Sequence, residues 1–348
     1  MSCGINEEEL KVTKSKKSFS KLLGQYSYVL VFFAIFAVYA ITAHGLTWSG
    51  VMNIFRHSAV IGTIGIGMGL VCLIGEIDLS VGSMLAFVSG FSVVIFNITG
   101  NIFLTLLFSL AFGAFCGLVN GFLVGVIRMP AFIVTLATML IYRSFVQYFC
   151  QHLAKNLIGG GSSVYRMDSK LPAYQTLYNF GNGKALTVPI VGIVMLLIVV
   201  LLTYVTTSTK FGKKIYAIGS NIKGAEMAGI NVDLMTVMVF VICGLLVGVA
   251  SFLWIAMNGS SDPATTGKSY EMYAIASAVL GGISMSGGKG RTLGILFGAM
   301  SYTVIDKIIV ALKMDSLIND AIKGIILLLV ILIQIIGPQL RRKLHKGV

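Results

Sequence analysis

The chain has 348 residues, of which 56% are hydrophobic and 11% charged, and its mean hydropathy is +0.91. A single water-soluble core cannot hide so much apolar surface, which excludes an ordinary soluble domain. The net charge of +13 comes from basic residues beside apolar stretches rather than on one soluble face, which favours anionic lipid over nucleic acid as the charged partner.

Apolar stretches near the roughly 20-residue length that crosses a bilayer recur from residue 26 to residue 337. Backbone polar groups in lipid must bond within their own segment, which selects helices. We therefore expect an all-α, polytopic transmembrane bundle, with broken or short spans near 75–82 and 271–291. The expected spans are 26–44, 58–75, 80–97, 101–127, 130–150, 187–208, 233–257, 271–285, 291–312 and 318–337.

The first apolar run, 28–43, follows a lysine-rich stretch, an arrangement shared by signal peptides and membrane anchors. The run is longer than the ~7–15-residue apolar region of a signal peptide, so we expect an uncleaved span. The chain is thereby divided into a tail over residues 1–25, a transmembrane domain over 26–337 and a second tail over 338–348.

Flanking charges predict the orientation. With a cytoplasmic N-terminus, sixteen basic residues lie inside: Lys11, Lys14, Lys16, Lys17, Lys21, Arg128, Lys210, Lys213, Lys214, Lys223, Lys289, Arg291, Arg341, Arg342, Lys343 and Lys346. Seven lie outside: Arg56, Lys155, Arg166, Lys170, Lys184, Lys268 and Lys313. Because basic residues accumulate in cytoplasmic loops, both tails and the loop 209–232 are predicted to face the cytoplasm.

Patterns that carry catalysis or bind metals are missing from the sequence. The cysteines are scattered without a Cys-x-x-Cys pair or a nearby histidine cluster, as expected of packing residues. The stretch 287–292 is glycine-rich and basic but lacks the Gly-x4-Gly-Lys-Ser/Thr spacing of a phosphate-binding loop. We therefore expect no catalytic residue, metal or cofactor in this chain, and any energy from ATP must come from another chain.

A polar stretch with Glu76, Asp78 and Ser80 interrupts two apolar runs. Carboxylates at membrane depth are costly unless they are paired or hydrated, and such breaks often line a cavity. The favoured interpretation is a turn in which Asp78 or Ser80 caps the helix beginning near Val81, and contact with a transported solute is the alternative.

A second polar, glycine-rich stretch, Leu280–Gly288, contains Ser284 and Ser286, and Glu271 precedes it in the same expected span. It resembles the first break, and each is followed by an apolar, glycine-spaced run, which indicates a weak internal duplication. Paired breaks of this kind mark translocation sites, although glycine and serine also permit close helix packing. Both interpretations stay open.

Two further polar residues, Asn120 and Thr135, fall within or at the start of expected spans. The Asn120 amide suits a sugar hydroxyl, but a hydrogen bond between helices is the better expectation. Together with the residues of the two breaks, these two complete the candidate path or gate: Glu76, Asp78, Ser80, Asn120, Thr135, Glu271, Ser284 and Ser286.

The loop 209–232 combines small residues with an amphipathic pattern and is consistent with a short helix. It is either a solvated loop on anionic headgroups or a docking element for a cytoplasmic partner. The candidate docking residues are Lys213, Lys214, Asn221, Ala225, Glu226 and Gly229.

At these residues the chain resembles the permease subunits of bacterial ABC importers for monosaccharides, of the ribose, galactose and xylose type. The matching stretches are Gly75–Gly82, Asn120–Leu136, Phe211–Ile230 and Tyr270–Gly290. The resemblance implies a multi-pass protein of the bacterial inner membrane, paired with a second permease, with two ATPase subunits below and a soluble sugar-binding protein above. It also implies that the loop 209–232 contacts the ATPase.

Two positions depart from the family pattern. The stretch 221–225 reads Asn-Ile-Lys-Gly-Ala where relatives usually carry Asn-Pro-Glu-Ala-Ala, which alters the charge of the implied docking surface. Tyr273 stands where an acid is common, a change that bears on the outer gate or on substrate preference.

The hypothesis from sequence is thus a non-enzymatic permease subunit that passes a monosaccharide inward. One alternative is an importer of the same broad family for nucleosides or branched-chain amino acids. A second is a proton-coupled secondary transporter that titrates Glu76 or Asp78.

Overall fold

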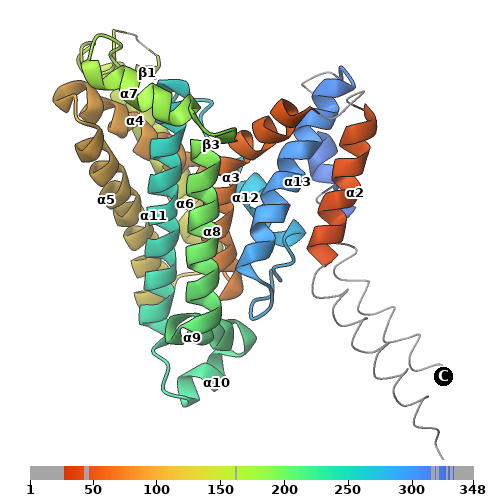
Figure 1. Ribbon diagram of the computed structural model, residues 1–348. Coiled ribbons are helices and arrows are strands. Elements are labelled where there is room, and N and C mark those ends of the chain that lie inside the picture. The colour runs from red at the N-terminus through yellow and green to blue at the C-terminus, as the bar shows by residue number, and fades with distance from the viewer. Residues whose placement is uncertain are drawn as a thin grey trace, which may run out of the picture.

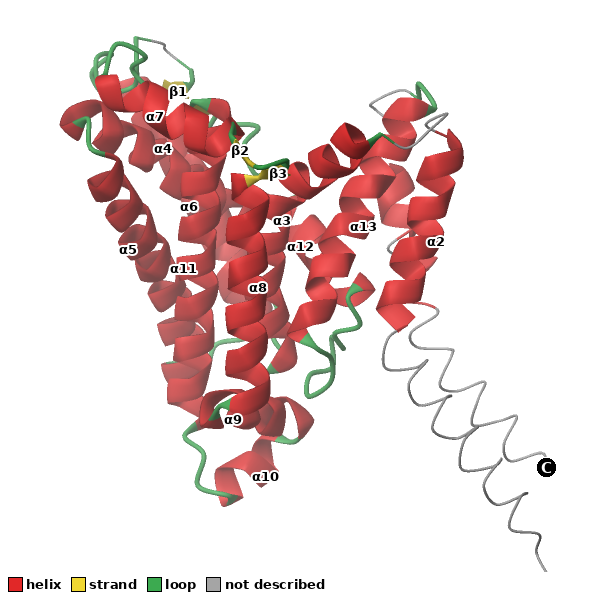
Figure 2. Cartoon of the chain, in the orientation of Figure 1, coloured by secondary structure: helices red, strands yellow, loops and turns green. Residues whose placement is uncertain are grey.

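The computed structural model describes residues 27–42, 47–160, 163–314, 318, 321–326, 328–329 and 332. The two predicted tails and half of the predicted span 318–337 lie outside these residues. Within them the chain forms a helical bundle (Figure 1) with only four two-residue strands (Figure 2), which confirms the all-α, polytopic prediction.

Seven helices in the described part of the chain are long and apolar enough to cross a membrane: α3 (Trp48–Leu73), α4 (Val81–Thr99), α5 with the π-helix η1 (Ile102–Val126), α6 (Ala131–His152), α8 (Ile190–Ser208), α11 (Val232–Asn258) and α13 (Thr292–Ala311). Two shorter apolar helices are α2 (Ser27–Thr42) and α12 (Tyr270–Leu280). The connections carry α7 (Pro172–Asn182), α9 (Lys210–Ser220) and α10 (Ile222–Met227).

The helices α9 and α10 lie at one end of the bundle and α7 lies at the other (Figure 1). We refer to these as the α9–α10 end and the α7 end. At the α7 end, β1 (Tyr165–Arg166) pairs antiparallel with β4 (Ser260–Ser261), and β2 (Lys184–Ala185) pairs with β3 (Val188–Pro189). The polar loop 151–186 therefore contains a helix and short strand pairings that the sequence did not predict.

The helix α3 begins at Trp48, ten residues before the predicted span 58–75. Its start is fixed by Thr47, whose side chain accepts a hydrogen bond from the amide of Gly50 at 3.1 Å. Arg56, which was predicted to lie in an outside loop, is therefore within α3, where its guanidinium donates to the side-chain oxygen of Asn182 in α7. The prediction failed because polar side chains in the first turns concealed the helix.

The predicted span 271–285 is wrong as a complete crossing. The helix α12 has 11 residues, which at about 1.5 Å per residue cover roughly half of a hydrocarbon core. It ends at Gly281 and Gly282, and Gly282 has a φ of +83°, which glycine adopts without strain. The expectation of short or broken spans near 75–82 and 271–291 is met at both places.

Glycines bring α5 and α11 into backbone contact. Gly113 and Gly117 of α5 face Gly244 and Gly248 of α11, and a Cβ added at Gly244 would overlap the carbonyl oxygen of Gly113. Small residues at this spacing let helix backbones approach closely, and the resulting packing promotes helix association in lipid. The contact fixes α5 and η1 beside the polar residues described next.

Candidate functional site

The first break lies between the end of α3 at Leu73 and the start of α4 at Val81. Asp78 in this break is completely buried. Its Oδ1 accepts hydrogen bonds from the backbone amide of Ser80 at 2.9 Å and from the hydroxyl of Ser80 at 2.6 Å. A carboxylate oxygen thus holds the turn together from inside.

Asn120 and Thr135 reach the same turn from α5 and α6. The Asn120 side-chain amide donates to Ser80 Oγ at 2.8 Å and to Asp78 Oδ2 at 3.4 Å. The Thr135 hydroxyl bonds the carbonyl of Ala131 at 2.8 Å and that of Ile77 at 3.4 Å. The expected hydrogen bond of Asn120 between helices is confirmed.

Four of the predicted path residues therefore form one cluster, Asp78, Ser80, Asn120 and Thr135, which we call the break cluster. All four are fully buried, so no solute reaches them in this conformation. Among the described residues, the Asn120 side-chain oxygen has no hydrogen-bond partner. The break cluster fastens three helices around the interruption in the membrane-spanning part of the fold.

The predicted side-chain cap of α4 is wrong in detail. Ser80 occupies the residue before the helix, but neither its side chain nor that of Asp78 bonds the first turn of α4 as a cap. Ser80 has a helical backbone conformation, and the Asp78 carboxylate is engaged by Ser80 and Asn120 instead. The interpretation of the stretch as a turn is correct.

Glu271, at the start of α12, lies against the first turn of α4. A Cβ added at Gly82 would overlap the Glu271 carboxylate and the carbonyl oxygen of Gly267. The side chain of Arg143, from α6, donates to the carbonyls of Pro263 and Thr266 at 2.9 and 2.7 Å, which holds the non-helical segment before α12. The start of α12 is thus in contact with the first turn of α4, and Glu271 itself is outside the break cluster.

Ser284 and Ser286 lie in the loop between α12 and α13, away from the break cluster. The Ser284 amide donates to the carbonyl of Lys289 at 2.9 Å, and the Ser286 amide donates to the Ser284 hydroxyl at 3.3 Å. Ser286 is exposed. These serines therefore shape a tight loop at the α9–α10 end, at the end of α12 opposite to Glu271.

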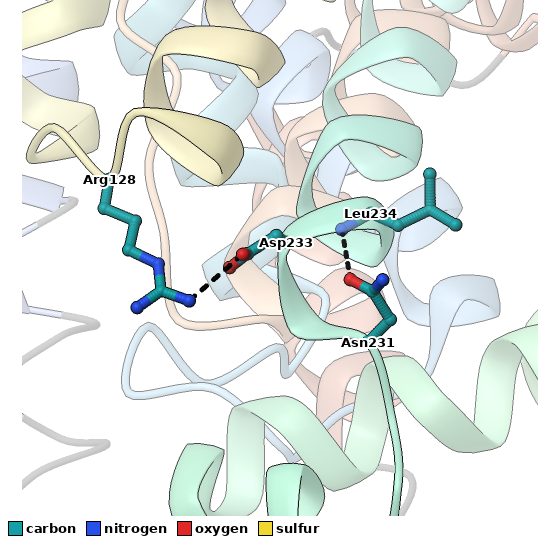
Figure 3. Close-up of polar contacts among 4 residues, drawn as sticks. All are labelled: Arg128, Asn231, Asp233 and Leu234. Carbon is teal, nitrogen blue, oxygen red and sulfur yellow. Dashed lines mark hydrogen bonds and ion pairs between the residues drawn. The ribbon is translucent and has the colours of Figure 1, made fainter.

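Glu76 is separated from Asp78 and lines a cavity of about 180 Å³ at the α9–α10 end. The cavity also contains Arg128, Glu226 and Asp233. Arg128 pairs with Asp233 at 3.0 Å, and Asn231 caps α11 by accepting from the amide of Leu234 at 2.9 Å (Figure 3). The ion pair of Arg128 and Asp233 joins the segment after η1 to the start of α11, at the α9–α10 end of the two helices.

The loop 209–232 forms two helices rather than the single short helix that was expected. The extended backbone of Asn221, with a φ of −165°, separates α9 from α10, and its side chain accepts from the amide of Gly224 at 3.0 Å. Lys213, Lys214 and Glu226 are exposed and Ala225 is buried. Gly229 follows α10 with a φ of +76° and open space where a Cβ would lie.

A family model described as branched-chain amino acid transport system / permease component matches residues 50–333. The chain belongs to this permease family. It is 33% identical over 313 residues to the ribose import permease protein RbsC of Escherichia coli, covering 90% of this chain and 94% of the relative. No solved structure is matched.

Two further relatives are similar over most of this permease. The ribose import permease protein RbsC of Bacillus subtilis is 34% identical over 286 residues, covering 81% of this chain and 84% of the relative. The autoinducer 2 import system permease protein LsrC of Yersinia enterocolitica is 32% identical over 275 residues, covering 79% and 72%. Together with the seven apolar helices, these matches make the chain a multi-pass membrane permease.

Sequence reasoning about the permease missed an ion pair in the membrane-spanning part. Lys323 Nζ lies 2.5 Å from Asp306 Oδ1 of α13 and is almost completely buried. The same ammonium is 4.6 Å from the ring centre of Tyr273 and 5.0 Å from that of Tyr302. An acid and a base in neighbouring apolar stretches were the available signal. Tyr273, the departure from the family pattern, is thereby part of an aromatic surface around a buried cation.

Proposed function

We propose that the chain is the permease subunit of an ATP-driven importer and passes a monosaccharide into the cell. The observation that carries the proposal is the alignment with ribose import permeases over nearly the full length of both proteins. The family description names branched-chain amino acids, but the relatives that align over most of this chain are named for ribose and autoinducer 2 import, which favours a sugar. Because these relatives are ATP-driven import permeases by family, the proton-coupled alternative is not favoured.

In this proposal the α9–α10 end faces the cytoplasm and the α7 end faces outward. The support is the excess of basic residues in the segments assigned to the inside, among them Lys210, Lys213, Lys214 and Lys223 of α9 and α10. Both tails, residues 1–25 and 338–348, then lie in the cytoplasm, and a soluble binding protein delivers sugar to the α7 end.

The ATPase subunits would dock on α9 and α10. Ile222 and Met227 of α10 are 50% and 86% exposed although both are large and apolar, and the charged residues Lys223 and Glu226 stand next to them in the sequence. An apolar tip with a charged rim is the usual composition of a surface that meets another protein. Lys213, Lys214, Asn221, Ala225, Glu226 and Gly229 would shape this surface.

The eight path candidates would act at two positions along the sugar path. The break cluster would hold the interruption between α3 and α4, with Glu271 beside it, so that the helices around the sugar path keep a defined bend. Glu76, Ser284 and Ser286 would lie at the cytoplasmic exit. A second permease, identical or not, would complete the path.

Co-purification tests this function. Tagged protein extracted in mild detergent should carry an ATPase subunit with it. A soluble binding protein loaded with a monosaccharide should then stimulate ATP hydrolysis by the complex, and the same protein without sugar should not. Recovery of the permease without any ATPase, at normal expression and with a single gel-filtration peak, would contradict the proposal.

Gly229→Val is expected to weaken ATPase association without preventing membrane insertion. A β-branched residue at a φ of +76° strains the backbone that positions α10, whereas the open space at this position leaves the rest of the fold undisturbed. The measurement is the ratio of ATPase to permease after pull-down.

Gly160→Val provides the matched control, because Gly160 also has a positive φ, +84°, and open space, but lies at the α7 end. It should leave the ratio unchanged. Equal ratios for Gly229→Val and the parent protein would show that the geometry after α10 does not matter for docking.

A further inference from the structure

The helix α9 is tied to the loop between α12 and α13 by one side chain. The Tyr216 hydroxyl donates to the carbonyl of Gly290 at 2.8 Å. Burial raises the pKa of this hydroxyl, so it keeps its proton and remains a donor. The bond joins residues 74 positions apart in the sequence, within the α9–α10 end.

Next to this bond, three segments meet through their backbones. The amide of Gly288 donates to the carbonyl of Leu73, the last residue of α3, at 2.9 Å. A Cβ added at Gly219 would overlap both this carbonyl and the Gly288 amide. No side chain therefore separates α9 from the end of α3 or from the loop 281–290. We call this contact, formed by Leu73, Tyr216, Gly219, Gly288 and Gly290, the three-way junction.

Backbone atoms make most of the contacts in the junction. Close-packed backbone atoms transmit displacement with little slack, whereas long side chains would absorb it by changing rotamer. The loop 281–290 is itself closed by a hydrogen bond from the Ser284 amide to the Lys289 carbonyl at 2.9 Å. The loop connects α12 to α13. Leu73, which it contacts, is the last residue of α3 and directly precedes the first break.

We propose that the three-way junction carries movement of α9 to both breaks of the membrane domain, and that Tyr216 is the positioning residue that keeps α9 and the loop 281–290 together. The proposal rests on the proposed function, because it takes the ATPase as the source of the movement. It assigns the coupling to a contact inside this chain, distinct from the exposed surface of α10 that would bind the ATPase.

Tyr216→Phe tests the tie in the permease alone. The ring keeps its packing and only the hydroxyl is lost, so the fold should persist. Hydrogen–deuterium exchange at Gly288 should rise about two- to tenfold, the range that corresponds to one net hydrogen bond. Tyr204→Phe is the matched control, since Tyr204 of α8 is 63% exposed, and it should leave this exchange rate unchanged.

The second measurement follows movement in the permease–ATPase complex. Ser286→Cys places a thiol on the exposed part of the loop, while Cys72, Cys116, Cys150 and Cys243 are buried and Cys3 is replaced by serine. We expect the rate of maleimide labelling to change when MgATP and vanadate are added. In Tyr216→Phe this change should shrink about two- to tenfold with the ATPase still bound, and in Tyr204→Phe it should persist.

Unchanged exchange at Gly288, or an undiminished nucleotide response in Tyr216→Phe, would overturn the inference. A parent complex that holds its ATPase but shows no nucleotide response at residue 286 would overturn it as well. By contrast, failure of the parent protein to retain any ATPase would count against the proposed function, and the exchange measurement on the permease alone would still decide whether Tyr216 holds the loop.

Discussion

Asp78→Ala should destabilise the protein strongly and abolish transport. Alanine removes the acceptor for the Ser80 amide, the Ser80 hydroxyl and the Asn120 amide at once. Each buried donor left without a partner costs about 1–3 kcal/mol, so we expect a loss of at least about 2 kcal/mol. The measurement is the thermal midpoint of the purified permease, followed by gel filtration after heating.

Asp78→Asn separates the hydrogen bonds from the charge. Asparagine retains a side-chain oxygen for both Ser80 donors and loses only the 3.4 Å acceptor of the Asn120 amide, which keeps its 2.8 Å bond to Ser80 Oγ. Its thermal midpoint and transport should therefore lie close to those of the parent protein. If Asp78→Ala is as stable as Asp78→Asn, the hydrogen bonds of the break cluster do not support the fold. If Asp78→Asn folds normally but abolishes a pH dependence of uptake, the result would support a proton-coupled transporter.

Gly244→Leu should prevent the bundle from forming. Even the first carbon of a side chain at this position would overlap the carbonyl oxygen of Gly113, and it would lie 2.8 Å from Gly117 Cα. The helices α5 and α11 must then separate along their whole contact, because rigid backbones cannot move aside locally. Overpacking by a single methyl group typically costs about 1–3 kcal/mol, so Gly244→Ala should lower the thermal midpoint, and leucine should leave little monodisperse protein.

The neighbouring residue provides the control for added bulk. Leu245 is 39% exposed on the same helix, and Leu245→Phe should express and elute as the parent protein does. Normal gel filtration of Gly244→Leu would show that α5 and α11 are not held together by their glycines.

Hydropathy predicted most of the spans because the length of an apolar run follows directly from bilayer thickness. It failed at α3, whose first turns contain Arg56 and His57 and are stabilised by a contact with α7 that sequence does not reveal. It also overestimated the length of α12, since Ile283 and Met285 extend the hydropathy of the run beyond Gly281 while the backbone turns there. The hydropathy of side chains does not indicate where the backbone changes direction.

Part of the candidate site could be predicted from the free-energy cost of placing polar residues in the membrane. Asp78, Ser80 and Asn120 are polar residues in apolar surroundings, and such residues are retained only with partners. Their mutual contact, by contrast, depends on how α5 packs beside the break, which the sequence did not reveal. Tyr216 and Gly219 gave no signal, because a tyrosine and a glycine in a short amphipathic helix are unremarkable until the loop 281–290 is placed against them.

The most direct test of the proposed function is uptake into liposomes that contain the permease with its ATPase, and whose medium contains the cognate binding protein. We expect ATP-dependent accumulation of a radiolabelled monosaccharide, tested with ribose first and then with other pentoses and hexoses, and no accumulation of leucine. ATP-dependent accumulation of leucine without any sugar, or sugar uptake that needs a proton gradient and no ATPase, would contradict it.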